Sequence, residues 1–281
     1  METIELLQTG MVTYLTLFAG FCARYFAIMG GLYVLLQVVF KRQLLVRRIQ
    51  QAFPHGREVA HEIRWSLING AFTGFTGMFL YRYISEGRTA LYYDISEHGW
   101  LYFATTLVLS VLGYETWIYW QHRWLHTPWL YRHVHVVHHV TNPTAFAALT
   151  RHPFEACIEQ IYYVLLILFV PLHPLAIGGT LALFFANGVI AHMGYEFYPR
   201  GFTRHRLLRW MNTSTYHNMH HRHQRCHYGN AFNFWDRWMG TYHPGYLATF
   251  DAVKARLDEA PVAADAPRPH VEPQVIAGPA A

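Results

Sequence analysis

Charged residues and cysteines are both scarce in this sequence of 281 residues. Asp, Glu, Lys and Arg make up 14% of the chain and hydrophobic residues 53%, whereas soluble domains usually carry about 25% charged residues. The shortage excludes an ordinary soluble surface and indicates that lipid covers part of the protein. The three cysteines lie far apart and form no CxxC pair, which excludes a disulfide framework and is typical of a reducing compartment.

Common cofactor and hydrolase motifs are also missing. The sequence has no glycine-rich dinucleotide loop, no phosphate-binding P-loop and no HExxH zinc motif. The net charge of +5 is not read as a nucleic-acid surface, because basic residues cluster directly after the first apolar segment. Such a cluster is typical of the cytoplasmic flank of a membrane helix.

Apolar residues form five segments that are predicted to be helices, at about 11–40, 65–84, 100–121, 156–172 and 174–191. A helix needs about 20 apolar residues to cross a bilayer, and the first three segments reach that length. The last two are short and are joined by the turn PLHP. They are expected to form a hairpin that either barely crosses the membrane or dips in and returns.

The distribution of basic residues predicts the orientation. Segment 41–64 carries six basic residues and loop 81–99 carries two, so the positive-inside rule places 41–64 in the cytoplasm. Counting crossings from there puts His122, His192 and everything after them on the same side. The expected fold is therefore an all-α membrane protein with four to five apolar helices and a cytoplasmic, histidine-rich helical cap.

We expect three regions along the chain. Residues 1–99 would form the N-terminal membrane helices, 100–245 the catalytic region, and 246–281 a C-terminal tail. From about residue 260 the tail is rich in Ala and Pro, a composition that cannot bury a core and predicts disorder.

Histidine is unusually abundant, with 20 residues, of which 16 lie between His122 and His243. Residues three and four apart share a helix face, and three clusters show this spacing: HRWLH, HVVHH and HNMHH. Their candidate metal ligands are His122, His126, His135, His138, His139, His217, His220 and His221. Eight imidazoles exceed the four ligands of one tetrahedral zinc, so either two metal ions or one ion with further supporting histidines is expected. Imidazole suits Fe, Zn, Cu or Ni, and spacing alone does not choose among them.

His192, which ends the fifth apolar segment, is predicted to be a ninth ligand. His152 is a candidate for a supporting role, and the alternative is that it only begins the next helix ahead of Pro153. The remaining histidines of this region are not expected to bind metal: His133, His173, His205, His223, His227 and His243.

Two acidic residues are candidates to support the ligands. Glu115 lies seven residues before His122 inside an apolar segment, and Glu196 follows His192 by four residues. A ligand histidine often donates the N–H of its other ring nitrogen to a carboxylate. The alternative for Glu115 is a pair with a tyrosine or with Arg24. Asp236, in the motif FWDRWMGT, is expected to organise the fold near the third cluster.

These motifs together resemble the fatty acid hydroxylase/sterol desaturase superfamily, with a spacing closest to the sterol C-5 desaturase branch. The resemblance covers about 100–245 and rests on HRWLH, HVVHH, HPFE, HMGYE and HNMHH, followed by HYGNAFNFWDRWMGT. One departure is His227, where eukaryotic sterol desaturases tend to carry Asn.

The resemblance implies a membrane enzyme that uses two iron ions and O2 to hydroxylate or desaturate a lipid C–H bond. Zinc would be possible in the purified protein. It also implies electrons from an external donor, such as a cytochrome b5-like protein, a ferredoxin or a reductase. Two other interpretations remain open at this point: a membrane zinc hydrolase, and a metal transporter or metal-storage protein.

Overall fold

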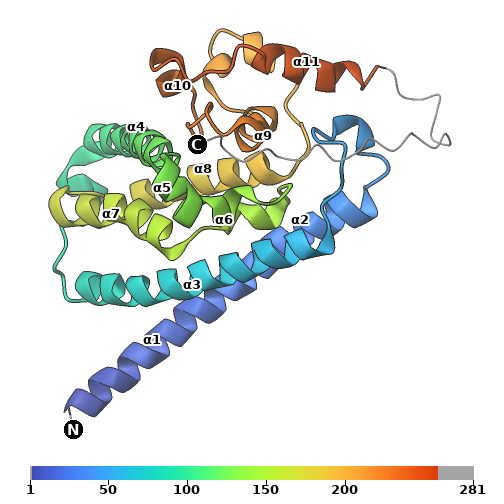
Figure 1. Ribbon diagram of the computed structural model, residues 1–281. Coiled ribbons are helices and arrows are strands. Elements are labelled where there is room, and N and C mark those ends of the chain that lie inside the picture. Colours follow the sequence, from blue (N-terminus) through green and yellow to red (C-terminus); the bar gives the residue numbers. More distant parts are fainter. Residues whose placement is uncertain (1, 259–281) are drawn as a thin grey trace.

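The computed structural model describes residues 2–258, and these residues form helices joined by loops, with isolated β-bridges but no strand (Figure 1). This confirms the predicted all-α architecture. The disorder predicted from about residue 260 lies outside the described residues.

The N-terminal region, up to Ser85, is a pair of long helices that pack side by side (Figure 1). Helix α1 (Glu2–Tyr25) continues through π-helical turns at Phe26–Gly30 and Val34–Val39, which flank α2 (Gly31–Tyr33). Helix α3 (Gly56–Ser85) then runs back along α1. Their contact depends on Gly70, because a Cβ at that position would lie 2.2 Å from the Phe21 ring.

Three further helices carry the site at their ends. They are α4 (Gly99–Leu125), α7 (Pro153–Phe169) and α8 (Pro174–His192). Helices α7 and α8 begin alike, with proline at the first position and a histidine cap before it. The Nδ1 atoms of His152 and His173 accept from the amides of Phe154 and Leu175, at 3.1 and 3.2 Å. Such caps satisfy amides that have no partner within the helix.

Shorter elements complete the fold. Between α4 and α7 lie α5 (Pro128–Leu130), a π turn (Tyr131–His135), α6 (Val136–His139) and a 3-10 turn (Ala145–Leu149). After α8 come α9 (Ser214–His223), α10 (Phe234–Trp238) and α11 (Tyr246–Ala255). Helix α11 packs Tyr246 and Phe250 against Tyr216 and Met219 of α9, so the start of the expected tail belongs to this cap.

Three segments are long and apolar enough to cross a membrane: Gln8–Val39, Gly99–Leu125 and Pro174–His192. They match three of the five predicted apolar segments. The other two lie within α3 and α7, which do not meet the same criteria of length and composition.

The loop after the first span contacts the chain that follows α8. The amide of Ile49 donates to the Gly194 carbonyl at 3.0 Å, and Arg48 donates to the Tyr195 hydroxyl at 3.1 Å. Gln50 reaches Asn218 of α9 at 3.3 Å. The basic loop and the third histidine cluster therefore lie on the same side of the molecule.

Replacing Gly70 with Ala should destabilise the protein, because the new methyl group would overlap the Phe21 ring. Gly77→Ala, on the same helix, is the matched control: its Cβ would lie 3.6 Å from Leu17, an ordinary contact. Both changes raise helix propensity equally. Relative to Gly77→Ala, we expect Gly70→Ala to lower the free energy of unfolding by about 1–3 kcal/mol, measured by denaturation in detergent. Equal stabilities would show that the α1–α3 contact relaxes freely.

Candidate metal centre

Nine histidine side chains converge where α4, α6, α8 and α9 meet, and they form two groups. Within each group the candidate ligand atoms all lie within 4.8 Å of one another. The first group is His122, His126, His135, His139 and His220. The second group is His138, His192, His217 and His221. These are the eight cluster histidines and His192, the nine ligands expected from the sequence.

The clusters in the sequence do not correspond to the groups in space. In α9, His217 and His221 belong to the second group, whereas His220 belongs to the first. Helical geometry explains this division, because a residue at i+4 is rotated by about 40° from residue i and a residue at i+3 by about 60° in the opposite direction. The same rule divides HVVHH, where His138 separates from the other two histidines.

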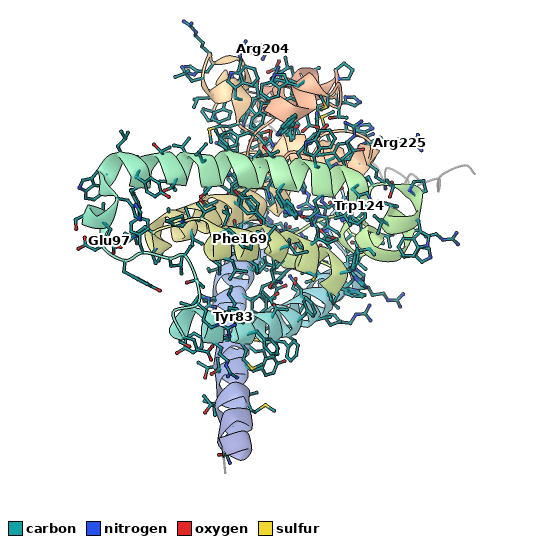
Figure 2. All side chains as sticks on the ribbon, turned by 90° about the vertical axis from the view of Figure 1, so that its left-hand side faces the viewer. Tyr83, Glu97, Trp124, Phe169, Arg204 and Arg225 are labelled. Atoms are coloured by element: carbon teal, nitrogen blue, oxygen red, sulfur yellow. The ribbon has the colours of Figure 1, made fainter. Side chains whose placement is uncertain are left out.

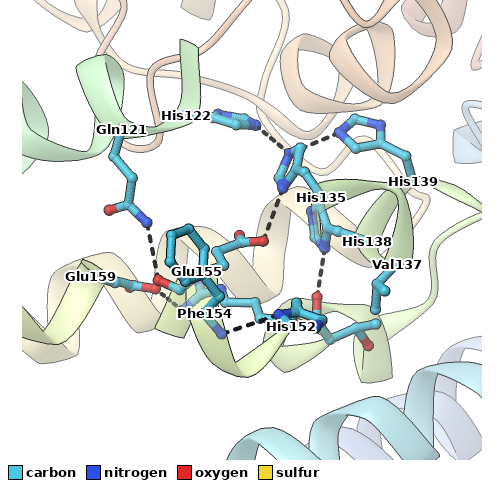
Figure 3. A network of polar contacts seen from close by, with 12 residues as sticks. Gln121, His122, His135, Val137, His138, His139, His152, Phe154, Glu155 and Glu159 are labelled. Atoms are coloured by element: carbon cyan, nitrogen blue, oxygen red, sulfur yellow. Dashed lines mark hydrogen bonds and ion pairs between the residues drawn. The ribbon is translucent and has the colours of Figure 1, made fainter. Parts of the chain in front are cut away.

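In both groups the Nε2 atoms face each other at short distances. His135 Nε2 lies 3.1 Å from Nε2 of His122 and 3.1 Å from Nε2 of His139 (Figure 3). In the second group, His192 Nε2 lies 3.1 Å from His138 Nε2 and 3.0 Å from His217 Nε2. Two nitrogens bound at right angles to one ion, each at about 2.1 Å, would be separated by about 3.0 Å.

The opposite nitrogen of several of these rings already has a hydrogen-bond acceptor. His122 Nδ1 lies 2.9 Å from the Tyr228 carbonyl, and His135 Nδ1 lies 2.9 Å from a Glu155 carboxylate oxygen. Three more rings direct Nδ1 at carbonyls in the same way: His138 at Thr150, His192 at Gly188 and His220 at Cys226.

These contacts fix the protonation of the rings. A carbonyl or carboxylate only accepts, so Nδ1 carries the single hydrogen of a neutral imidazole. When both rings are neutral, Nε2 of His122 and Nε2 of His135 are both unprotonated, and no hydrogen is available to bridge the 3.1 Å between them. The facing lone pairs repel unless a cation lies between them. His126 Nε2 is also buried, and it has no hydrogen-bond partner among residues 2–258. The donor set therefore fits two metal ions.

Burial favours the neutral imidazole at five of these positions. It lowers the pKa of His138, His139, His217, His220 and His221 well below the usual value, and neighbouring imidazoles lower it further. A neutral imidazole has a free lone pair, which is the form that binds metal.

Glu155 is a supporting residue that the sequence reasoning missed. It follows His152 and Pro153 in the HPFE motif, so its place in the first turn of α7 was available as a signal. Glu155 contacts His135 Nδ1, and this is the kind of contact with a ligand histidine that the sequence predicts for Glu115. A carboxylate at this position orients the ring and raises its basicity as a ligand.

Glu115 supports the site from a different position. Its two oxygens accept from the amides of Asn230 and Ala231, each at 2.9 Å, and the structure shows it bonded to no histidine among residues 2–258. Asp236 binds the adjacent amides of Tyr228 and Gly229, each at 2.8 Å. The two buried carboxylates thus hold the loop 226–231, whose carbonyls at positions 226 and 228 accept from His220 and His122.

Glu196 and His152 also act away from the imidazoles. One oxygen of Glu196 accepts from the amide and hydroxyl of Thr215, at 2.9 and 2.7 Å, at the start of α9. It therefore positions the helix that carries the third cluster. His152 caps α7 and packs against Trp65, outside both groups.

The histidines not expected to bind metal lie outside both groups: His133, His173, His205, His223, His227 and His243. His227 is fully buried, and its backbone is left-handed, with φ of 60°. Its Nδ1 donates to the Tyr216 carbonyl at 2.9 Å and its Nε2 accepts from the His243 amide at 3.0 Å. Both ring nitrogens are thereby satisfied.

A cavity of about 60 Å³ opens against imidazoles of both groups. Its other polar lining residues are Gln121, Arg151, Glu155, Glu159 and Asn230. Arg151 forms a buried ion pair with Glu159, which also accepts from the Tyr114 hydroxyl. The space beside the histidines is therefore small, and its lining combines apolar residues with a buried ion pair.

Comparison with known proteins gives consistent matches. The profile of the fatty acid hydroxylase family matches residues 107–241. The chain is similar to a Delta(7)-sterol 5(6)-desaturase of Gibberella zeae, with 29% identity over 56% of this chain and 47% of the relative. It is also similar to lathosterol oxidase of Rattus norvegicus, with 28% identity over 66% of this chain and 62% of the relative.

A Delta(7)-sterol-C5(6)-desaturase of Nicotiana tabacum is 31% identical over 56% of each chain. The chain thus spans about half to three fifths of the length of these curated relatives. No solved structure matches. The matches confirm the resemblance expected from the histidine motifs.

Replacing His192 with Ala should reduce the metal content of the purified protein. The wild type is expected to bind about two ions per chain, and the variant fewer, because the second group would lose one of its four imidazoles and bind its ion more weakly. His152→Ala is the matched control, since His152 lies outside both groups, and it should keep the wild-type content. Elemental analysis measures both. Equal metal in the two variants would remove His192 from the ligand set.

His227 should make the fold sensitive to acid. Burial lowers the pKa of His227 to about 3, whereas an unfolded histidine has a pKa of about 6.5. Below pH 6.5 the unfolded chain binds a proton that the folded chain does not, so stability falls with pH by up to about 1.4 kcal/mol per unit.

His227→Asn tests this sensitivity, because Asn tolerates a left-handed backbone and does not titrate. The variant should be less stable than the wild type at pH 7.5, having lost two hydrogen bonds. The difference in unfolding free energy should shrink by about 2 kcal/mol at pH 5. A difference that stays constant between the two pH values would contradict the assignment.

Proposed function

We propose that this chain is a membrane-bound di-iron oxidoreductase that uses O2 to hydroxylate or desaturate a lipid C–H bond, and the match of residues 107–241 to the fatty acid hydroxylase family supports the proposal. The observation that carries the proposal is the set of facing, unprotonated Nε2 atoms in two groups of buried imidazoles. Bound at these nitrogens, two iron ions would activate O2 toward a C–H bond, using two external electrons.

The residues of the chain prepare this site by holding the ligands in place. Glu155 holds the His135 ring through Nδ1. The loop 226–231, fixed by Glu115 and Asp236, holds His122 and His220. Ligands whose orientation is set in advance need little rearrangement when metal binds, which favours both affinity and a defined reaction geometry.

The apolar helices support an integral membrane location, with the histidine groups at the ends of α4 and α8. The excess of basic residues in 41–64 over 81–99 favours a cytoplasmic position for the groups and for the cap. A cytoplasmic site would be accessible to a soluble or membrane-bound electron donor.

An external electron donor is part of the proposal, because the sequence has no dinucleotide or P-loop motif of its own. A cytochrome b5-like protein, a ferredoxin or a reductase would fill this role. The substrate would be a lipid such as a sterol or a fatty acyl chain. The relatives named for action on sterols favour the first of these.

Oxygen uptake tests the proposed chemistry. Iron-loaded wild-type protein, supplied with a reductant and a donor protein, should consume O2 when membrane lipid extract is added, and His192→Ala should not. Lipid profiles of a strain that lacks the gene should show one hydroxyl group or double bond missing. Bound zinc, with hydrolysis of a lipid and no O2 uptake, would overturn the proposal in favour of a zinc hydrolase. Metal transport without either reaction would favour a transporter.

A further inference from the structure

An apolar groove of about 440 Å³ lies between α4 and α7, on the face of the molecule shown in Figure 2. Trp117, Trp120 and Trp124 line it from α4, and Ile158 lines it from α7. Trp120 and Trp124 are 45% and 49% exposed, although α4 is apolar enough to cross a membrane. The groove therefore opens where lipid would surround the protein.

The two helices stay in contact along the groove through specific packing. Gly113 permits this approach, because a Cβ there would lie 2.5 Å from the Tyr162 hydroxyl. The Trp117 indole donates to the Ile158 carbonyl at 3.2 Å. The groove therefore results from specific packing between the two helices.

Gln121 is the residue shared by the groove and the cavity beside the histidines. Its Nε2 donates to the Glu155 carbonyl at 3.2 Å, which joins α4 to α7 between the two spaces (Figure 3). This bond also fixes the orientation of the amide, because a carbonyl can only accept.

The amide oxygen of Gln121 is therefore the group left without a hydrogen-bond partner, at the residue that lines both spaces. Gln121 is 8% exposed, and its Oε1 has no hydrogen-bond partner in the described part of the chain. An unpaired buried oxygen is unfavourable unless a donor from outside the chain reaches it. A bilayer supplies few donors, and the hydroxyl group of a lipid is one that arrives with an apolar body suited to the groove.

We propose that the groove between α4 and α7 admits a hydroxyl-bearing lipid and that Gln121 Oε1 accepts a hydrogen bond from its hydroxyl group. The interpretation of this groove as a substrate site rests on the proposed function. Gln121 directly precedes His122, and both line the cavity. The hydrogen bond would therefore hold the hydroxyl end of the lipid close to the histidine groups, while the apolar remainder lies along the tryptophans.

Photolabelling tests the groove without requiring turnover. Wild-type protein in lipid nanodiscs is labelled with two diazirine probes, one a sterol and one a long-chain alcohol, and with the methyl ether of each. Peptide mapping should place the label on α4 and α7 beside Trp117, Trp120 and Ile158. At least one hydroxyl probe should label about three- to tenfold more than its methyl ether, the effect of one hydrogen bond. The skeleton that shows the larger preference identifies the class of lipid.

Two variants separate recognition from packing. Gln121→Leu keeps the size of the side chain and removes the acceptor, so the label should remain in the groove but the preference for the hydroxyl probe should disappear. Leu109→Ala, at a 60% exposed position of α4 that does not line the groove, should change neither.

Opposite results would overturn the inference. Label spread evenly along the lipid face of α4, including Leu109, would show that the groove does not select a ligand. A hydroxyl preference that persists in Gln121→Leu would show that water, and not a lipid, satisfies Oε1. Because no reaction is measured, groove labelling with Gln121-dependent preference in a protein that consumes no O2 would retain the lipid site and reject only the proposed chemistry.

Discussion

Repulsion between buried imidazole nitrogens is the constraint on which the rest of this structure depends. His122 and His135 each direct the hydrogen on Nδ1 to an acceptor, and their Nε2 atoms still lie 3.1 Å apart. No group among residues 2–258 compensates this contact, so the free energy of binding a metal here would also be free energy for joining the cap to the helices. The ends of α4 and α8 meet α9 at this point, and each contributes imidazoles to the two groups.

Polar contacts, more than apolar packing, make the surroundings of the ligands rigid. The loop 226–231 has carboxylates on its amides and imidazoles on its carbonyls. Gly229 is required within it, since a Cβ would lie 2.2 Å from the Phe232 carbonyl and 2.9 Å from Glu115. A buried network of this kind is favourable only when every member has a partner. The carboxylates of Glu115 and Asp236 therefore bind backbone amides of the loop, and the carbonyls of this loop in turn orient His122 and His220.

The parts of the site that are local in sequence were predictable, and the parts that depend on contacts between distant segments were not. Spacing of three and four residues identified eight of the nine histidines that meet, and the position at the end of an apolar segment identified His192. Spacing did not reveal which histidines of α6 and α9 share a group, because that depends on how the two helices face each other. Glu115 was identified as an important buried acid, but its partners lie 115 and 116 residues away. Membrane segments followed from composition, whereas the packing of α11 on α9 required tertiary contacts.

The two faces of helix α9 have different contacts, and the two sides of the site differ as a result. One of its faces presents His217, His220 and His221 to the groups, and another packs Tyr216 and Met219 into the aromatic core of the cap. The cap therefore lies against the histidine groups on the side that α9 occupies. On the opposite side the cover is a pair of helices, α4 and α7, with a groove between them. Under the proposed function, a site bordered by an apolar groove favours a substrate that arrives through the bilayer, because an apolar molecule then moves from lipid to protein without crossing water.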